Sequence, residues 1–93
     1  MSARLSEPEI LTALELVPEW HRENEEIVRT FTLGNFVEAV EFVNQVTEPA
    51  EDADHHPDID IRWNLVALSV VSHSAGGVTK ADLALAERIS AVA

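Results

Sequence analysis

The chain has 93 residues, of which 46% are hydrophobic and 25% charged, the composition of one ordinary folded domain. Seventeen acidic and six basic residues give a net charge of −11, which repels phosphate backbones and argues against nucleic-acid binding. The chain has no cysteine, which excludes disulfides, thiolate metal sites and thiol nucleophiles. No apolar run approaches the roughly 20 residues of a membrane helix, and the first residues lack the apolar core of a signal peptide. We expect a single cytoplasmic domain over residues 1–93, whose site suits a neutral small molecule better than an anion.

The first third of the chain predicts one helix and two strands. Ser6-Glu-Pro-Glu9 is a capping box with proline in the first turn, and it opens a helix that should end at Pro18. Alternating side chains then predict strands at about 19–24 and 26–33. Because the connection between them is short, the two strands should pair as an antiparallel hairpin.

The middle of the chain predicts a second helix followed by an acidic segment. Asn35-Phe-Val-Glu38 is a capping signature, and the apolar stripe after it runs at helical spacing as far as Val46. We expect this helix to fade towards Pro49. The segment 48–58 is expected to be a loop or a last frayed helical turn.

The last third predicts a second hairpin and a third helix. The alternation from Ile59 to Trp63 is typical of a strand, a tight turn is expected at 64–65, and the β-branched run from Val66 to Ser72 should be the antiparallel partner. Gly76-Gly77 breaks the chain, and Thr79-Lys-Ala-Asp82 caps the final helix.

The resulting order, α-β-β-α-β-β-α, predicts an α+β fold. Short connections favour a four-stranded antiparallel sheet with helices packed on one face, which leaves the other face or the edges to water or to another subunit. Trp20 and Trp63 are expected to be core residues, although either could also line an aromatic pocket.

Three of the four histidines are expected to meet at one end of the sheet. His55 and His56 precede Pro57, and with the hairpin turn at 64–65 residues 56–57 lie opposite 72–73, beside His73. Three interpretations are open: polar residues bonded to backbone, a three-histidine zinc site, or acid–base chemistry near pH 7. Acidic neighbours that could orient the rings are Glu51, Asp52, Asp54 and Asp58.

The segments "EDADHHPDIDIRWN" and "LVALSVVSHSAGGVTKAD" resemble the signature of the pterin-4a-carbinolamine dehydratase family, and the resemblance extends over nearly the whole chain. It implies an assembly as a homodimer or a tetramer of dimers. It also implies dehydration of 4a-hydroxytetrahydrobiopterin to quinonoid dihydropterin, which recycles the pterin used by aromatic amino-acid hydroxylases. Neither a metal nor an organic cofactor is implied.

The resemblance also implies roles for individual residues. His55, His56 and His73 would be catalytic, with His56 and His73 making the proton transfers and His55, backed by Glu51, orienting the substrate. The implied substrate-binding residues are Glu51, Pro57, Asp58, Trp20, Ser72 and Asp82.

Two positions depart from the animal-type pattern. In that pattern an aromatic residue often follows His-His-Pro-acidic, whereas this chain has Ile59 there. Ala75 occupies a position at which cysteine can occur. The isoleucine would weaken stacking on the pterin and so lower affinity, while the acid–base residues stay intact. Two alternative functions remain: a non-catalytic dimerisation or assembly partner on the same fold, and a metal-dependent enzyme that uses the three histidines.

Overall fold

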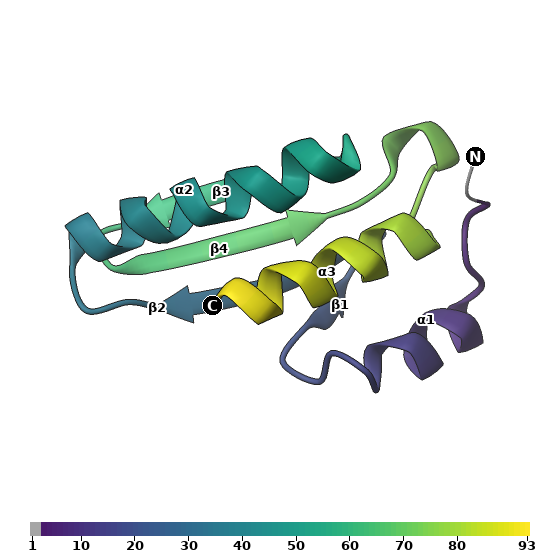
Figure 1. Ribbon diagram of the computed structural model, residues 1–93. Helices are drawn as coiled ribbons and strands as arrows, with labels where there is room; N and C mark the ends of the chain where they lie inside the picture. The colour runs from purple at the N-terminus through teal and green to yellow at the C-terminus, as the bar shows by residue number, and fades with distance from the viewer. Residues whose placement is uncertain (1–2) are drawn as a thin grey trace.

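The computed structural model describes residues 3–93, and it confirms the predicted order of three helices and one antiparallel sheet (Figure 1). The strand order in the sheet is β1-β2-β4-β3. The elements are α1 (Glu7–Leu14), β1 (His21–Glu23), β2 (Glu26–Thr32), α2 (Phe36–Ala53), β3 (Asp58–Arg62), β4 (Leu65–Val70), a short 3₁₀ turn η1 (His73–Ala75) and α3 (Lys80–Val92). None of the helices in residues 3–93 combines the length and the apolarity needed to cross a bilayer.

Reciprocal capping boxes fix the start of α1 and of α3. At α1, the backbone N–H of Glu9 donates to Ser6 Oγ (3.3 Å), and the N–H of Ser6 donates to the Glu9 carboxylate (2.8 Å). The bond from the Ser6 backbone holds the pKa of Glu9 below its ordinary value. The helix ends at Leu14, earlier than expected. The backbone N–H groups of the next three residues donate to carbonyls three positions back, so these residues form turns instead of continuing the helix.

Helix α2 is longer than the sequence predicts. It continues through Pro49 to Ala53, so the first part of the segment 48–58 is helical, as the alternative of a last helical turn predicts, and the expected fading at Pro49 is wrong. Proline removes one helical hydrogen bond, but Pro49 and Ala50 are both buried, and that burial offsets the loss. The residue after the helix is left-handed (φ 50°), and the N–H of His55 donates to the Ala50 carbonyl (3.0 Å). The end of α2 therefore sets where the histidine segment begins.

The turn of the second hairpin lies one residue earlier than expected. Arg62 pairs with Leu65, so the turn residues are Trp63 and Asn64. Asn64 is anchored to Leu33 in both directions, through the Leu33 N–H to its carbonyl (2.8 Å) and through its side-chain amide to the Leu33 carbonyl (3.0 Å). Trp63 is left-handed (φ 54°) and 68% exposed, so the expectation that it is a core residue is wrong; Trp20, 3% exposed, does lie in the core.

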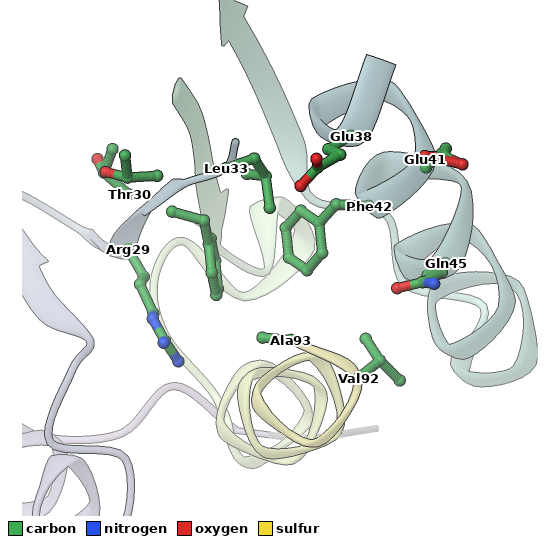
Figure 2. A pocket seen from close by; sticks show the side chains of 11 residues that line it. Arg29, Thr30, Leu33, Glu38, Glu41, Phe42, Gln45, Val92 and Ala93 are labelled. Atoms are coloured by element: carbon green, nitrogen blue, oxygen red, sulfur yellow. The ribbon is translucent and has the colours of Figure 1, made fainter. Parts of the chain in front are cut away.

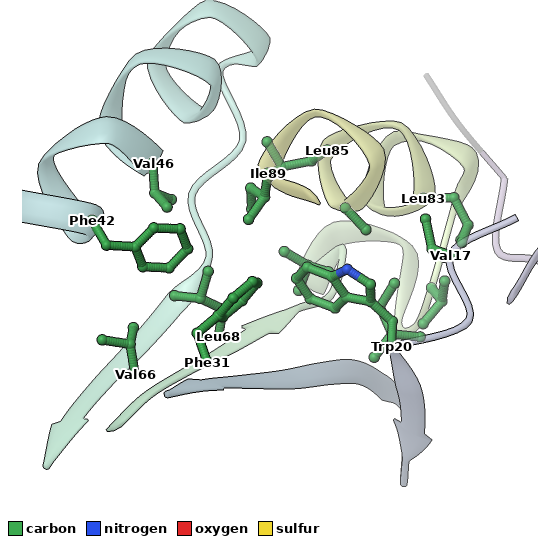
Figure 3. Close-up of a cluster of buried hydrophobic side chains, with 14 of the residues drawn as sticks. Val17, Trp20, Phe31, Phe42, Val46, Val66, Leu68, Leu83, Leu85 and Ile89 are labelled. Atoms are coloured by element: carbon green, nitrogen blue, oxygen red, sulfur yellow. The ribbon is translucent and has the colours of Figure 1, made fainter. Parts of the chain in front are cut away.

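The hydrophobic core fills the space between the sheet and helices α2 and α3, which cover one of its faces (Figures 1 and 3). In its centre Phe31 packs against Trp20 and Phe42, with ring centroids 6.3 and 4.6 Å apart. The fully buried members from the sheet and the C-terminal helix include Ile27, Val66, Leu68, Leu85 and Ile89. This packing holds the ends of α2 and α3 in place over the sheet.

The helices leave the outer strand of this face uncovered. Ile59 pairs with Leu68 and Ile61 with Val66, so all four side chains share the core-facing side of the sheet. Leu68 and Val66 are fully buried, whereas Ile59 and Ile61 are 42% and 36% exposed. Strand β3 is therefore an edge strand with an apolar, solvent-facing row.

The core predicts a large difference between two leucines. Leu68→Ala should lower the free energy of unfolding by about 2–5 kcal/mol, because it removes buried methyl groups and leaves a cavity. Leu11→Ala is the matched control, since Leu11 is 59% exposed on α1, and its effect should stay within about 0.5 kcal/mol. Urea denaturation measures both, and equal losses would contradict this description of the core.

Candidate active site

The two adjacent histidines have different carboxylate partners. His55 Nε2–H donates to Asp82, and His56 Nε2–H donates to Glu51 on the last turn of α2 (2.6 Å). The side chain of His55 is 19% exposed and that of His56 is 61% exposed. The expectation that Glu51 backs His55 is therefore wrong: Glu51 contacts His56, and the neighbouring ring turns inward to α3, as successive side chains of an extended segment do.

Asp82 is the buried centre of the cluster. Its carboxylate is fully buried and accepts from the Thr79 backbone N–H (2.7 Å), from Ser72 Oγ (2.9 Å) and from His55. A buried carboxylate is costly unless hydrogen-bonded, and donors meet both oxygens here. Asp82 also lies in the first turn of α3, where the helix dipole favours negative charge. This one side chain thus links the end of α2, the segment after β4 and the start of α3.

The third histidine stands on the loop that Asp82 anchors. His73 follows Ser72, whose backbone forms an isolated bridge with Gly77. The loop closes through Gly76, which is left-handed (φ 75°) and donates its N–H to the His73 carbonyl (3.1 Å). The residue His73 itself is exposed. Ser72 shares the Asp82 carboxylate with His55, so the two histidine segments are joined side by side through Asp82.

Strand pairing does not bring the histidines together in the way the sequence predicts. The expected register placed 56–57 opposite 72–73, but Asp58 pairs with Ser69, two positions away from that register. The earlier turn at Trp63 and Asn64 causes this shift. The contact between the two segments instead comes from side chains beyond the strands.

Thr79 is a member of the cluster that sequence reasoning treated only as a helix cap. It is 1% exposed, and its hydroxyl lies 2.8 Å from Ser72 Oγ and accepts from the Ala81 N–H (3.2 Å). The Thr79-x-x-Asp82 capping box is the sequence pattern from which the contact between Thr79 and Asp82 could be predicted. It did not reveal that the same carboxylate also holds a histidine 27 residues earlier in the chain.

The remaining predicted site residues lie at different depths. Pro57 is half-buried beside His56, and Asp58 is exposed at the start of β3. Trp20 is buried, and its indole N–H donates to Ser90 Oγ (3.0 Å), eight residues beyond Asp82 on α3 and thus about 12 Å along the helix. Trp20 therefore contacts the opposite end of α3 from the histidine cluster.

The cluster lies at an open surface. Four cavities of about 310 to 700 Å³ are found between other elements, and none of these four is lined by His55, His56 or His73. Within residues 3–93 no group of three histidine or carboxylate side chains is arranged to hold a metal ion. The arrangement offers one anchored imidazole and two exposed ones, which suits proton exchange with a bound molecule.

Comparison with known proteins gives one consistent assignment. The sequence model of the family described as pterin 4 alpha carbinolamine dehydratase matches residues 3–92. A protein of Chloroflexus aurantiacus is 54% identical over 96% of both chains, and one of Thermomicrobium roseum is 47% identical over 98% of both; the names of both assign them to the pterin-4-alpha-carbinolamine dehydratases.

Solved structures agree with that assignment. The crystal structure of a transcriptional coactivator/pterin dehydratase from Brucella melitensis is 35% identical, with a TM-score of 0.91, and covers 97% of this chain and 98% of its own. A pterin dehydratase-like protein described as a RuBisCO assembly factor of the alpha-carboxysome has a TM-score of 0.62 at 19% identity and shows the fold alone. By its sequence and its structure, the chain belongs to the pterin-4a-carbinolamine dehydratase family, a family of hydro-lyases.

Proposed function

We propose that this chain dehydrates 4a-hydroxytetrahydrobiopterin to quinonoid dihydropterin by histidine acid–base catalysis, and so recycles pterin for aromatic amino-acid hydroxylases. The observation that carries the proposal is the pair of histidine–carboxylate contacts, His55 with buried Asp82 and His56 with Glu51, beside the exposed His73. Family membership supplies the substrate class.

The reaction needs one proton donated and one removed. A protonated imidazole gives its proton to the 4a-hydroxyl, the C4a–O bond breaks and water leaves. A neutral imidazole or another base takes the proton from N5, and the N5 electron pair closes the C4a=N5 double bond. We assign these transfers to His56 and His73, because both are exposed and can exchange protons with solvent between turnovers.

The remaining residues hold or contact the substrate in this proposal. His55 orients the pterin from a ring that Asp82 fixes. Pro57, Asp58 and Ser72 lie beside the histidines and can contact the substrate. Asp82 and Trp20 are buried, so we assign Asp82 to positioning His55, and Trp20 contributes to the core that supports α3.

We also propose that two copies pair through their β3 edges. An antiparallel pairing centred on Ile61 places Asp60 of each copy opposite Arg62 of the other, and it avoids opposing two Asp60 side chains. It covers the exposed Ile59 and Ile61 and brings the exposed Trp63 of one copy next to Ile59 of the other. Because β3 begins directly after Pro57, this pairing would add a wall to the open histidine site.

The catalytic assignment predicts a selective loss of activity. His56→Ala and His73→Ala should each lower kcat by about 10² to 10⁴ without unfolding the chain, because each removes a proton-transfer group from an exposed position. The 4a-carbinolamine absorbance in a coupled hydroxylase reaction, corrected for spontaneous dehydration, measures the rate. His21→Ala is the matched control, since His21 is exposed on β1 and, within residues 3–93, its side chain bonds only to Glu23.

Two outcomes of that assay would contradict the assignment. If the wild-type chain does not exceed the spontaneous rate, the non-catalytic assembly role on the same fold becomes the better hypothesis. If both variants turn over at the wild-type rate, other groups carry the protons.

The positioning of His55 predicts a second effect. Asp82→Asn keeps the shape but replaces one acceptor oxygen by a donor, so kcat should fall by about 10² with little change in KM. The His55 Nε2–H signal in proton–nitrogen spectra should also be lost to solvent exchange. Asp52→Asn is the control, because Asp52 is exposed and, in the described part of the chain, pairs only with Arg88 on the surface. A purely structural role of Asp82 would lower stability while leaving kcat unchanged in the folded fraction.

The edge pairing predicts a charge-dependent dimer. Arg62→Asp should yield monomers in sedimentation velocity, because it sets like charges opposite one another, and Asp60→Arg combined with Arg62→Asp should restore the dimer. Arg88→Asp makes the same change in net charge away from β3 and should leave the dimer intact. A monomeric wild-type chain, or a dimeric Arg62→Asp variant, would rule the pairing out.

A further inference from the structure

One arginine lies on the wrong side of the sheet for a charged residue. In β2, Ile27 pairs with Val70, Arg29 with Leu68 and Phe31 with Val66, so Arg29 occupies the core-facing side between two apolar neighbours. Leu68, directly opposite, is fully buried, and Arg29 itself is half-buried. A charged group in this position requires a specific compensation.

Arg29 has no carboxylate partner within residues 3–93, which is unusual in this chain. The four other arginines each lie within 4 Å of a carboxylate: Arg4 with Glu25, Arg22 with Glu7 and Glu25, Arg62 with Asp60, and Arg88 with Asp52. The chain has seventeen acidic residues, so carboxylates are plentiful. The half-buried arginine is the one left without a counter-ion in this part of the chain.

The guanidinium group is nevertheless held in a fixed position. It stacks over the Phe31 ring, 4.1 Å from the centroid, and Nη1 donates to Ser90 Oγ (3.1 Å). Ser90 is itself fixed, because the same oxygen accepts the indole N–H of Trp20. An arginine has five N–H donors, and within residues 3–93 the Arg29 side chain makes this one hydrogen bond, so a planar edge is available for an anion.

A cavity of about 510 Å³ adjoins this group between β2, α2 and the end of α3 (Figure 2). Figure 2 shows Arg29 reaching from β2 toward the end of α3, where Ala93 and Val92 lie, with Leu33 and Phe42 across the cavity. Phe31 and Phe42 give the cavity aromatic walls. Its size suits a small organic molecule rather than an inorganic ion, and polar and apolar side chains contribute to its lining in similar measure.

We propose that this cavity binds a small monocarboxylate with an apolar or aromatic body. The carboxylate would accept two N–H bonds from Arg29, and the body would lie against Phe31 and Phe42. Glu38 and Glu41 line the same cavity, and their charges disfavour a multiply charged ligand such as phosphate. Arg29 is thus a local exception to the expectation that this acidic chain prefers neutral ligands. The cavity is separate from the histidines, so the proposal does not depend on the proposed dehydration.

A titration with benzoate, followed in proton–nitrogen correlation spectra of the whole chain, tests the site. The expected shifts lie in β2, α2 and the end of α3, and inorganic phosphate at the same concentration should give no comparable shifts there. Arg29→Gln should weaken binding by about tenfold or more, and Arg29→Lys by less, because lysine keeps the charge without the planar pair of donors. Arg88→Gln removes a charge from the surface of α3 and should bind benzoate as the wild type does.

A second variant keeps the test independent of folding. Val92→Trp fills the cavity from the exposed end of α3 and leaves Arg29 in place, so it should weaken benzoate binding at unchanged thermal stability. The proposal is overturned if benzoate causes no shifts around the cavity, if phosphate binds as well as benzoate, or if folded Arg29→Lys and Val92→Trp both bind with wild-type affinity.

Discussion

The buried carboxylate of Asp82 is the interaction on which the candidate site depends. It lies where three segments distant in sequence meet, and it bonds to the backbone of Thr79, the hydroxyl of Ser72 and the ring of His55. Without it, the buried Thr79 N–H, the Ser72 hydroxyl and the His55 ring would each lose the carboxylate that accepts their hydrogen bond. The same bonds that make burial of Asp82 tolerable also hold the ring of His55 and the Ser72 hydroxyl next to His73. Stability and the arrangement of the site therefore cannot be separated at this position.

Local signals in the sequence were enough for the order of the elements but not for their ends. The capping boxes at Ser6 and Thr79 act within four residues, so the sequence predicts them and the structure confirms them. The end of α2 and the turn at Trp63 depend on distant contacts. Burial of Pro49 extends the helix, and Leu33 holds Asn64 in the turn. Neither contact leaves a periodic pattern in the sequence.

The sequence predicts which residues belong to the candidate site better than it predicts how they contact one another. The histidines were found because the family resemblance and the hairpin both pointed to them. The sequence does not indicate which carboxylate each ring contacts: Glu51 contacts His56 rather than His55, and Asp82 contacts His55. The sequence shows which acids are near in the chain, whereas the side on which each imidazole lies depends on the Schellman-type end of α2. A shift of one residue in that cap would exchange the two environments.

The helices cover the sheet unevenly, and the edge strand β3 that they leave partly exposed is available for contact with a second copy of the chain. Helices α2 and α3 bury the core-facing side chains of β2 and β4, whereas those of β3 stay partly exposed. The histidine segment is the chain that leads from α2 into this edge strand. Copies with a charge of −11 repel one another, so any contact between them requires a region of low charge and apolar surface. Strand β3 provides this, because Arg62 sits beside Asp60 and two isoleucines face outward. An open site placed directly before such an edge can be closed by a second copy without any movement of its own chain. The rings of His55 and His56 would then keep the positions that Asp82 and Glu51 give them.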